Sequence, residues 1–254
     1  MTFEILISTI HCNFFNKNSV IPDNTLIINQ HSSESTMCPN IKNVYNFKES
    51  GLSRSRNHAI DLCTGDICHI SDDDIVYIEN MKEIILNAFN DNLSADIITF
   101  QVQLPNTKLY KNYKKEKFWH TRKSIMGVMS VEIAFRSQAI KDYNLKFDEN
   151  FGLGAAFPTG EENIFLSDAL KKGLNILYIP LPIVIHPLET SGKNYADTSI
   201  IEAKGAMLYR IFGFLGYPVS FVFAYRQYKY SALSLNEFYS TMLRGIKKYG
   251  DRHE

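Results

Sequence analysis

The sequence predicts an α/β fold with a mostly parallel, helix-flanked sheet, followed by a helical appendage. Two observations carry this prediction. In the first hundred residues, short apolar strands alternate with amphipathic helices, as in a Rossmann-like nucleotide-binding half. Beyond Thr198 the chain is amphipathic and helical, without further strand patterns. We therefore expect an α/β domain over residues 1–198, with halves 1–102 and 103–198, and a helical region over residues 199–254.

In the first half, the expected strands are nearly continuous apolar runs, as in a sheet that is buried on both faces. They are residues 3–9, 25–29, 42–47, 67–70 and 95–102. The first expected helix has Ser53 as its N-cap and ends at Gly65. The second covers residues 79–90.

The second half is less regular. Residues 104–123 lose periodicity and are dense in lysine and tyrosine, as in a long functional loop. After it we expect strands at 125–129 and 131–135, a helix at 161–172, and an apolar stretch at 175–185 that two prolines interrupt. The C-terminal region is expected as two helical pieces, broken near Gly216 and Pro218.

The composition is that of an ordinary globular protein. Of the 254 residues, 45% are hydrophobic and 21% are charged, which excludes a disordered chain. Lysine plus arginine and aspartate plus glutamate number 27 each, so no net charge recruits nucleic acid, and no nucleic-acid partner is expected. The four cysteines form no C-x-x-C pair, and free buried thiols are the simplest interpretation.

The ends of the chain and its apolar runs predict a cytoplasmic location. The first residues lack a basic start and a small-residue cleavage site, so they indicate a strand and not a secretory signal. The longest uncharged apolar run, residues 211–225, is shorter than the roughly 20 residues that span a bilayer. No transmembrane helix is expected.

Three consecutive carboxylates, Asp72, Asp73 and Asp74, follow a buried strand at the sheet edge where open α/β sheets bind ligands. Adjacent carboxylates repel one another, whereas a divalent cation that bridges a diphosphate needs hard oxygen ligands. In an extended chain Asp72 and Asp74 point the same way. One of them can therefore reach a ribose or a metal-bound water, while the other binds the metal. The alternative is a solvated turn before the next helix.

Two arginines, Arg54 and Arg56, occupy the first turns of the helix just upstream. Positive charge at a helix N-terminus opposes the dipole, so a bound anion would help to explain the pair. A solvated surface pair is the alternative.

These motifs together resemble glycosyltransferase family 2. The resemblance rests on G-L-S-R-S-R-N-H-A at 51–59, G-D at 65–66, D-D-D at 72–74, and the run 131–163 that ends in G-E-E-N. It extends over residues 1–190 and implies a GT-A fold, with a nucleotide-binding half at 1–102 and an acceptor-binding half at 103–198. The implied activity is metal-dependent, inverting transfer from a nucleotide diphosphate sugar, above all a UDP-sugar, to a glycan or lipid-linked glycan, as in surface polysaccharide synthesis.

The resemblance also implies roles for single residues. The acid that closes the family's G-E-D motif is the catalytic base, and Glu162 matches it, with Glu161 before it. Which carboxylate reaches the acceptor stays open, and helix N-terminal acids are the alternative for both. His186 matches a histidine that ligates the metal or touches the diphosphate, and imidazole suits manganese beside carboxylates. Asp72, Asp74 and His186 are thus the expected ligands of Mn²⁺ or Mg²⁺, although a structural histidine is an equal alternative.

Donor contacts are expected from Ser8, Thr9, Arg54, Arg56, Asp72 and Asp73. The chain departs from the family at the end of the second strand, where Asn29 and Gln30 replace an aspartate that reads uracil. Trp119 and its loop are either an acceptor platform or plain surface. Residues 152–157 are expected as a flexible active-site loop and not as an NAD site.

Two other functions compete with transfer. A non-catalytic nucleotide-sugar binding module would share the fold but not need the carboxylates. A sugar-phosphate nucleotidyltransferase would need a glycine-rich phosphate loop after the first strand, which is absent from the sequence. For residues 200–230, apolar and basic composition predicts peripheral contact with a membrane. Packing on the domain or a homo-oligomer interface is the alternative.

Overall fold

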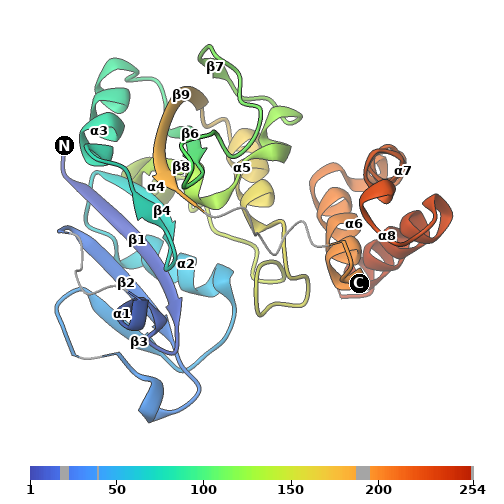
Figure 1. Cartoon of the computed structure of the whole chain (residues 1–254), viewed down its shortest axis with the longest axis horizontal. Helices are drawn as coiled ribbons and strands as arrows, with labels where there is room; N and C mark the ends of the chain where they lie inside the picture. Colours follow the sequence, from blue (N-terminus) through green and yellow to red (C-terminus); the bar gives the residue numbers. More distant parts are fainter. Residues whose placement is uncertain (18–22, 39, 187–194, 253–254) are drawn as a thin grey trace.

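The computed structural model describes residues 1–17, 23–38, 40–186 and 195–252. These residues form a twisted central sheet with helices on both faces and a separate group of C-terminal helices (Figure 1). Along the sheet the strand order is β3-β2-β1-β4-β8-β6-β9-β5, and β7 pairs with β9. The strands are β1 (Phe3–Ile10), β2 (Thr25–Gln30), β3 (Val44–Phe47), β4 (Ile67–Asp72), β5 (Val76–Tyr77), β6 (Ile97–Gln103), β7 (Phe118–Trp119), β8 (Ile133–Arg136) and β9 (Ile176–Ile185).

The first four long strands run parallel, as their continuous apolar runs predict. β1 pairs with β2 and with β4, and the register sets Ser8 beside Asp72. The carboxyl ends of β1 and β4 therefore meet at one edge of the sheet, where side chains that follow both strands can share a site.

The second half of the sheet is mixed. β8 is antiparallel to both β4 and β6, whereas β6 and β9 are parallel. The prolines expected to interrupt residues 175–185 do not break β9. Pro182 pairs with Gln101, and the register shifts on either side of that pair absorb the irregularity.

Residues 125–129 are not a strand, so that prediction was wrong. A 3₁₀ helix covers Ser124–Gly127, because Ser124 closes a turn with Thr121: the Ser124 amide donates to the Thr121 carbonyl and the Thr121 amide donates to Ser124 Oγ. A second 3₁₀ turn, Ser130–Glu132, precedes β8. The strand expected at 131–135 therefore begins at Ile133.

The helices of the α/β part cover both faces of the sheet. Phe14 and Ile85, on α1 and α3, pack in one hydrophobic cluster, whereas Ile60, Ile140 and Phe165, on α2, α4 and α5, pack in the other. Both clusters are largely buried, so the sheet is covered on both sides as a parallel sheet requires. The helices are α1 (Asn13–Lys17), α2 (Leu52–Leu62), α3 (Met81–Asp91), α4 (Ser137–Asp142) and α5 (Glu161–Lys171).

Helix α2 begins and ends earlier than expected. Its N-cap is Gly51 and its C-cap is Cys63. Ser53 lies inside the helix, where its hydroxyl donates to the Phe151 carbonyl at 2.6 Å. All four cysteines are free thiols, and each except the partly exposed Cys12 is buried.

As far as the structure describes it, to residue 252, the C-terminal region has three α-helices, not two: α6 (Thr198–Phe212), α7 (Gly216–Gln227) and α8 (Leu235–Gly250). The chain turns at Gly213, whose φ of 59° is left-handed, and Pro218 lies in the first turn of α7, where proline is tolerated. Helices α6 and α8 cross in backbone contact. A Cβ at Gly205 would collide with the Met242 carbonyl, and one at Gly245 with the Glu202 carbonyl.

The C-terminal helices share a hydrophobic cluster with the α/β part. Phe151, Phe157 and Ile164 pack in it together with residues of α6 and α8. Among the described residues, one helical segment, Thr198–Tyr230, is long and apolar enough by length and composition to cross a membrane, with a mean hydropathy of 1.4. A third of that hydropathy window is buried, and Gly213 divides the segment into α6 and α7.

Candidate active site

A cavity of about 610 Å³ opens at the carboxyl ends of β1 and β4. Its walls come from these strand ends, the first turns of α2 and α5, the end of β9, and α6. It brings together most of the residues that the sequence singles out: Ser8, Thr9, Arg56, Asp72, Asp73, Asp74, Glu161, Glu162 and His186.

Arg56 joins the two acidic clusters of the cavity. Its guanidinium donates to Asp72 Oδ1 at 2.9 Å and to Glu161 Oε1 at 2.8 Å, and only 4% of its side chain is exposed. Burial alone would lower the pKa of Arg56, but the charges of Asp72, Glu161 and Glu162 outweigh it and raise that pKa. Arg56 is therefore a permanent cation that holds carboxylates from β4 and α5 in fixed positions.

Asp73 is held by the first strand. Thr9 Oγ1 donates a hydrogen bond to Asp73 Oδ2 at 2.7 Å and accepts one from the backbone amide of Phe14 at 3.0 Å. Ser8 Oγ accepts a hydrogen bond from Ser55 Oγ at 2.8 Å. Both small polar side chains line the cavity while they fix its walls.

Asp74 and His186 face each other across the cavity mouth, with 3.9 Å between Oδ1 and Nε2. Nearly half of the Asp74 side chain is exposed, whereas His186 is buried and its backbone amide donates to the Gln103 carbonyl. A carboxylate oxygen and an imidazole nitrogen at this spacing suit a Mn²⁺ or Mg²⁺ ion that takes its other ligands from a diphosphate and water. Asp72 does not join them as a third close ligand among the described residues, because its Oδ1 is paired with Arg56. The pair Asp74 and His186 therefore fits a divalent cation, whereas the expected third ligand is turned to Arg56.

Glu161 and Glu162 begin α5, after Gly160. The left-handed φ of Gly160, 100°, and the close approach of Met207 both require glycine here, since a Cβ would lie 2.7 Å from Met207 Sδ. Desolvation and the charge of Glu161 raise the pKa of Glu162 to about 8, while Lys204 acts to lower it. Glu162 is thus a carboxyl group whose proton affinity suits proton transfer near neutral pH.

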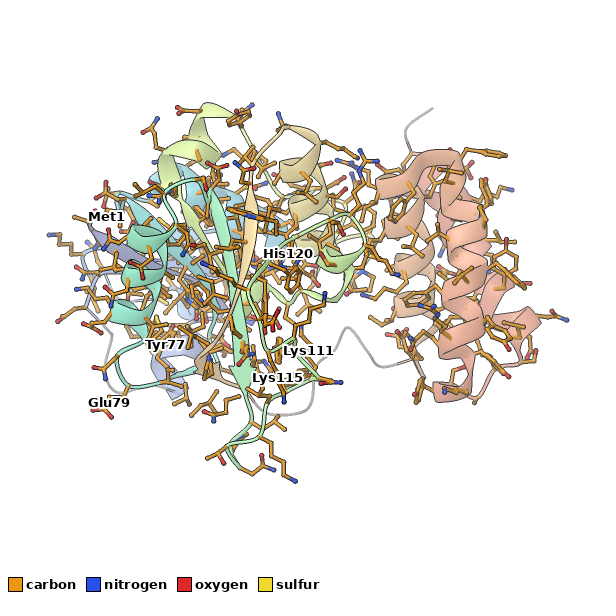
Figure 2. All side chains as sticks on the ribbon, turned by 90° about the horizontal axis from the view of Figure 1, so that it is seen from above. Met1, Tyr77, Glu79, Lys111, Lys115 and His120 are labelled. Carbon is orange, nitrogen blue, oxygen red and sulfur yellow. The ribbon has the colours of Figure 1, made fainter. Side chains whose placement is uncertain are left out.

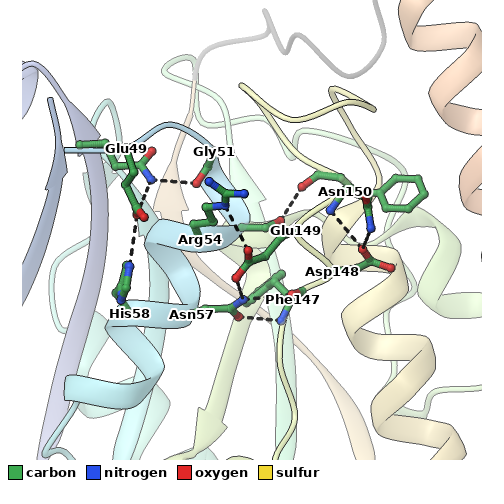
Figure 3. Close-up of polar contacts among 12 residues, drawn as sticks. Glu49, Gly51, Arg54, Asn57, His58, Phe147, Asp148, Glu149 and Asn150 are labelled. Carbon is green, nitrogen blue, oxygen red and sulfur yellow. Dashed lines mark hydrogen bonds and ion pairs between the residues drawn. The ribbon is translucent and has the colours of Figure 1, made fainter. Parts of the chain in front are cut away.

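Arg54 lies outside the cavity lining. Its Nε donates to Glu149 Oε2 at 3.1 Å, and both side chains are about half exposed (Figure 3). Asn57 holds the same segment, since its amide group exchanges hydrogen bonds with the backbone of Phe147 (Figure 3). The two arginines of the motif therefore separate: Arg56 enters the site, whereas Arg54 ties α2 to residues 147–149.

The end of β2 is engaged in structural hydrogen bonds. Asn29 donates to Asn46 Oδ1 and accepts the amide of Cys12, while Gln30 donates to Glu49 and to the Gly51 carbonyl. Gln30 lines the cavity. Gln30 thereby holds the loop before α2 in place, whereas Asn29 connects β2 to β3 and to the segment before α1.

Two further segments that the sequence singles out lie differently with respect to the cavity. Trp119 is half exposed and does not line the cavity, and His120 lies inside the α/β part (Figure 2), with Nε2 2.8 Å from Thr99 Oγ1. Residues 152–157 form a turn closed by a bridge between Phe151 and Phe157. Leu153 and Gly154 from this turn line the cavity.

Lys204 is the charged residue of the cavity lining that the sequence did not predict. It comes from α6, in the region expected as an appendage, and its Nζ lies 3.2 Å from Thr159 Oγ1. No local motif surrounds it, because its presence in the cavity depends on how α6 packs against α5. The C-terminal helices are therefore part of the site.

Comparisons with known proteins agree with this architecture. A family model described as "Glycosyl transferase family 2" matches residues 14–152, more than half of the chain. A search of curated proteins finds no match.

Among solved structures, crystal structures of S. aureus TarS are similar. TarS 1–349 in complex with UDP-GlcNAc has a TM-score of 0.60 and 12% identity, over 98% of this chain and 80% of that one. TarS 1–349 in complex with UDP has a TM-score of 0.55 and 14% identity, over 90% of this chain and 72% of that one. A longer S. aureus TarS structure has a TM-score of 0.55 and 15% identity, and the match covers 91% of this chain and 44% of that one. At these identities the likeness concerns the fold.

Proposed function

Since this chain belongs to glycosyl transferase family 2, has the GT-A fold and is therefore a glycosyltransferase, we propose that it transfers a sugar from a UDP-sugar to a hydroxyl group of a glycan or lipid-linked glycan. The proposed reaction is metal-dependent and inverts the anomeric carbon, and it takes place in the cytoplasm. One observation carries the proposal: Asp72–Asp74 with His186, and Glu161 with Glu162, line a single cavity and are joined through Arg56.

The donor side of the proposed site is the sheet edge. Asp74 and His186 would hold the divalent cation, which when bound neutralises the charge that develops on the leaving diphosphate, and Asp72 lies beside them in its ion pair with Arg56. Ser8, Thr9 and Asp73 lie along the same wall. Their hydroxyl and carboxylate groups are suited to contact the nucleoside, and the choice of UDP is supported by the TarS structures with UDP and UDP-GlcNAc.

The acceptor side is the N-terminus of α5. Glu161 is occupied by its ion pair with Arg56, whereas Glu162 is half-buried, lines the cavity and has a raised pKa. We therefore assign Glu162 as the general base and Glu161 as a positioning residue. Glu162 takes the proton of the acceptor hydroxyl as that oxygen attacks the anomeric carbon from the face opposite the diphosphate, so a single displacement inverts the centre.

The test is a donor and product screen with the purified full chain. UDP-, GDP- and dTDP-sugars are offered with glycan acceptors in Mn²⁺, in Mg²⁺ and in excess chelator, and released nucleotide is measured. We expect UDP release that needs the metal and depends on Asp74, so that Asp74→Asn lowers transfer by at least about 100-fold. Asp91→Asn, at the exposed end of α3, is the matched control and retains wild-type rates.

The anomeric configuration of the product, read by NMR, tests the mechanism. An inverted product supports single displacement. Full transfer in chelator would refute the metal requirement, and a retained configuration would refute the role of Glu162 as a base in one step.

A further inference from the structure

Helix α7 exposes most of its large apolar side chains to solvent. The face that it buries against α6 and α8 carries the small residues Gly216, Ser220 and Ala224, and Val219 and Phe223 are half-buried against the same hydrophobic cluster. The solvent face carries large apolar residues: Phe214 and Leu215 in the preceding turn, then Tyr217, Phe221, Val222 and Tyr225. Amphipathic helices of globular proteins show the opposite arrangement.

We propose that this outer face of α7, with the turn before it, docks on the surface of a membrane that contains anionic lipids. The proposal goes beyond the proposed reaction and does not depend on it. The exposure of the face is large: 82% of Phe214 and 64% of Tyr225 are in contact with solvent. Contiguous apolar surface of this kind marks an interaction site.

The fold prevents α7 from rotating to bury this face. Gly216 lies so close to α6 that a Cβ there would be 2.6 Å from the Cα of Tyr209. Ser220 and Ala224 are fully buried one and two turns further along. Large side chains would not fit in their place, so the apolar face stays outside.

The charge of this region selects an anionic lipid surface. No acidic residue occurs from residue 203 to residue 236 in the sequence. Arg226 and Lys229 are exposed where α7 ends, and Lys229 lies over the ring of Tyr230, 5.2 Å from its centre. Basic side chains are attracted to anionic headgroups, and tyrosine rings favour the depth of the headgroups.

A second copy of this chain fits the face less well. A two-fold interface sets the same patch against itself, so Arg226 and Lys229 would meet their own positive charge without an acidic partner in the segment. Crossing the membrane is also disfavoured. Helix α7 has 12 residues, fewer than the roughly 20 that span a bilayer, and Ile201 and Leu208 of α6 are buried.

Docking on the surface would hold the enzyme beside membrane-bound acceptors. Helix α6 lies between α7 and the α/β part (Figure 1), and it also supplies Lys204 to the cavity. The catalytic site and the docking face are therefore two sides of the same group of helices.

The experiment is vesicle flotation of the full-length protein with phosphatidylcholine alone and with added phosphatidylglycerol. We expect flotation with the anionic vesicles that weakens as salt rises. Phe214→Glu with Tyr225→Glu lowers the bound fraction by about tenfold or more, because it puts charge on the inserted face. Leu93→Glu is the matched control, since Leu93 is 78% exposed but lies beside α3, and it leaves flotation unchanged.

A second pair of variants tests the charge. Arg226→Gln with Lys229→Gln reduces binding to anionic vesicles and its salt dependence, whereas Lys115→Gln with Lys117→Gln, an exposed pair on the loop before β7, does neither. Thermal melting of every variant confirms folding.

Two results would overturn the proposal. One is a flotation result: the wild-type protein does not float, or the double variant Phe214→Glu with Tyr225→Glu floats as well as the wild type. The other is a dimer, seen in analytical ultracentrifugation without lipid, that the same double variant dissociates while flotation is absent. That result would identify α7 as a contact between two copies of the chain.

Discussion

Arg56 lies between Asp72 and Glu161 with almost none of its side chain exposed, and both ion pairs are within 3 Å. Removal of one carboxylate would leave a buried cation with half of its compensation, which is costly in a low-dielectric site. Changes at these three positions should therefore be strongly non-additive. The geometry of the proposed donor side and that of the proposed acceptor side depend on one guanidinium.

The assignment of Glu162 as the base predicts a clean separation of chemistry from binding. Glu162→Gln keeps the shape of the side chain but cannot accept the proton, so transfer falls by roughly 10²- to 10⁴-fold while UDP-sugar affinity stays near wild type. Single-turnover rates and calorimetric binding measure the two effects. Glu79→Gln, at the exposed end of the molecule far from α6 (Figure 2), is the control.

The neighbouring glutamate should behave differently. Glu161→Gln weakens the ion pair with Arg56, so it lowers thermal stability as well as activity. If Glu161→Gln instead stops transfer in a fully stable protein and Glu162→Gln does not, the base is Glu161.

The raised pKa of Glu162 predicts the pH dependence of transfer. A base must be deprotonated, so kcat/KM rises with pH and levels off above about 8, the pKa of Glu162 in the free enzyme. Lys204 lowers that pKa, so Lys204→Met raises it and moves the acidic limb of the profile to higher pH. Lys204→Arg keeps the charge and should keep the wild-type profile. An unchanged profile in Lys204→Met would contradict the coupling.

The residues of the site differ in how far the sequence could predict them. Asp72–Asp74 and Glu161–Glu162 form contiguous motifs at the ends of regular elements, so their place in the cavity could be expected. Arg54 and Arg56 share one motif, but two residues of helix turn a side chain by about 200°, so only one of them can face the cavity. Lys204 had no local signal, because its position follows from long-range packing.

At the scale of the elements, the contact between α6 and the α/β part supports α5, the helix that carries Glu161 and Glu162. Arg210 of α6 donates to Asp168 of α5 through both terminal nitrogens, at 3.2 and 2.7 Å, and to Asp148 at 2.9 Å. Met207, one turn earlier, packs on Gly160. Helix α6 thereby fixes both the start of α5 and its middle.

This contact predicts a stability difference between two arginines. Arg210→Met should lower the free energy of unfolding by about 1–3 kcal/mol, since it removes a bidentate, partly buried pair. Arg244→Met breaks the ion pair between Arg244 and Glu202. Because the Arg244 side chain is more than half exposed, this change should lower the free energy of unfolding by less than about 1 kcal/mol. Urea denaturation measures both, and equal losses would show that the α6–α5 contact is not special.

The elements were predictable where one physical signal dominated. Continuous apolar runs gave the parallel strands, because burial on both faces excludes polar residues. Residues 125–129 are also apolar, but the run is short, and the hydrogen bonds between Thr121 and Ser124 wind it into a 3₁₀ turn. In the C-terminal region, Gly213 rather than Pro218 ends α6, since proline is compatible with the first turn of the next helix.

At the scale of the whole molecule, the sequence predicts a GT-A domain over residues 1–198 with a helical region after it, and hydrophobic packing connects the two parts. Phe151, Phe157 and Ile164 lie in one cluster with α6–α8. Removal of the helices would expose these side chains and take Lys204 from the cavity.

We therefore expect a fragment of residues 1–197 to lose transfer and to melt less cooperatively than the full chain. Calorimetry and the UDP-release assay measure these properties. A fragment that melts sharply and transfers sugar at the wild-type rate would show that residues 1–197 are a self-sufficient enzyme.

The backbone contact between α6 and α8 offers a way to recognise family members that share these C-terminal helices. Gly205 and Gly245 each face a carbonyl of the other helix at a distance that leaves no room for a side chain. Each glycine follows a basic residue, Lys204 or Arg244, and both lie beyond the stretch that the family model matches. A genomic search for family members with this pair of basic-glycine dipeptides after the catalytic segment should therefore retrieve enzymes that share the three-helix bundle, including those whose remaining C-terminal sequence has diverged.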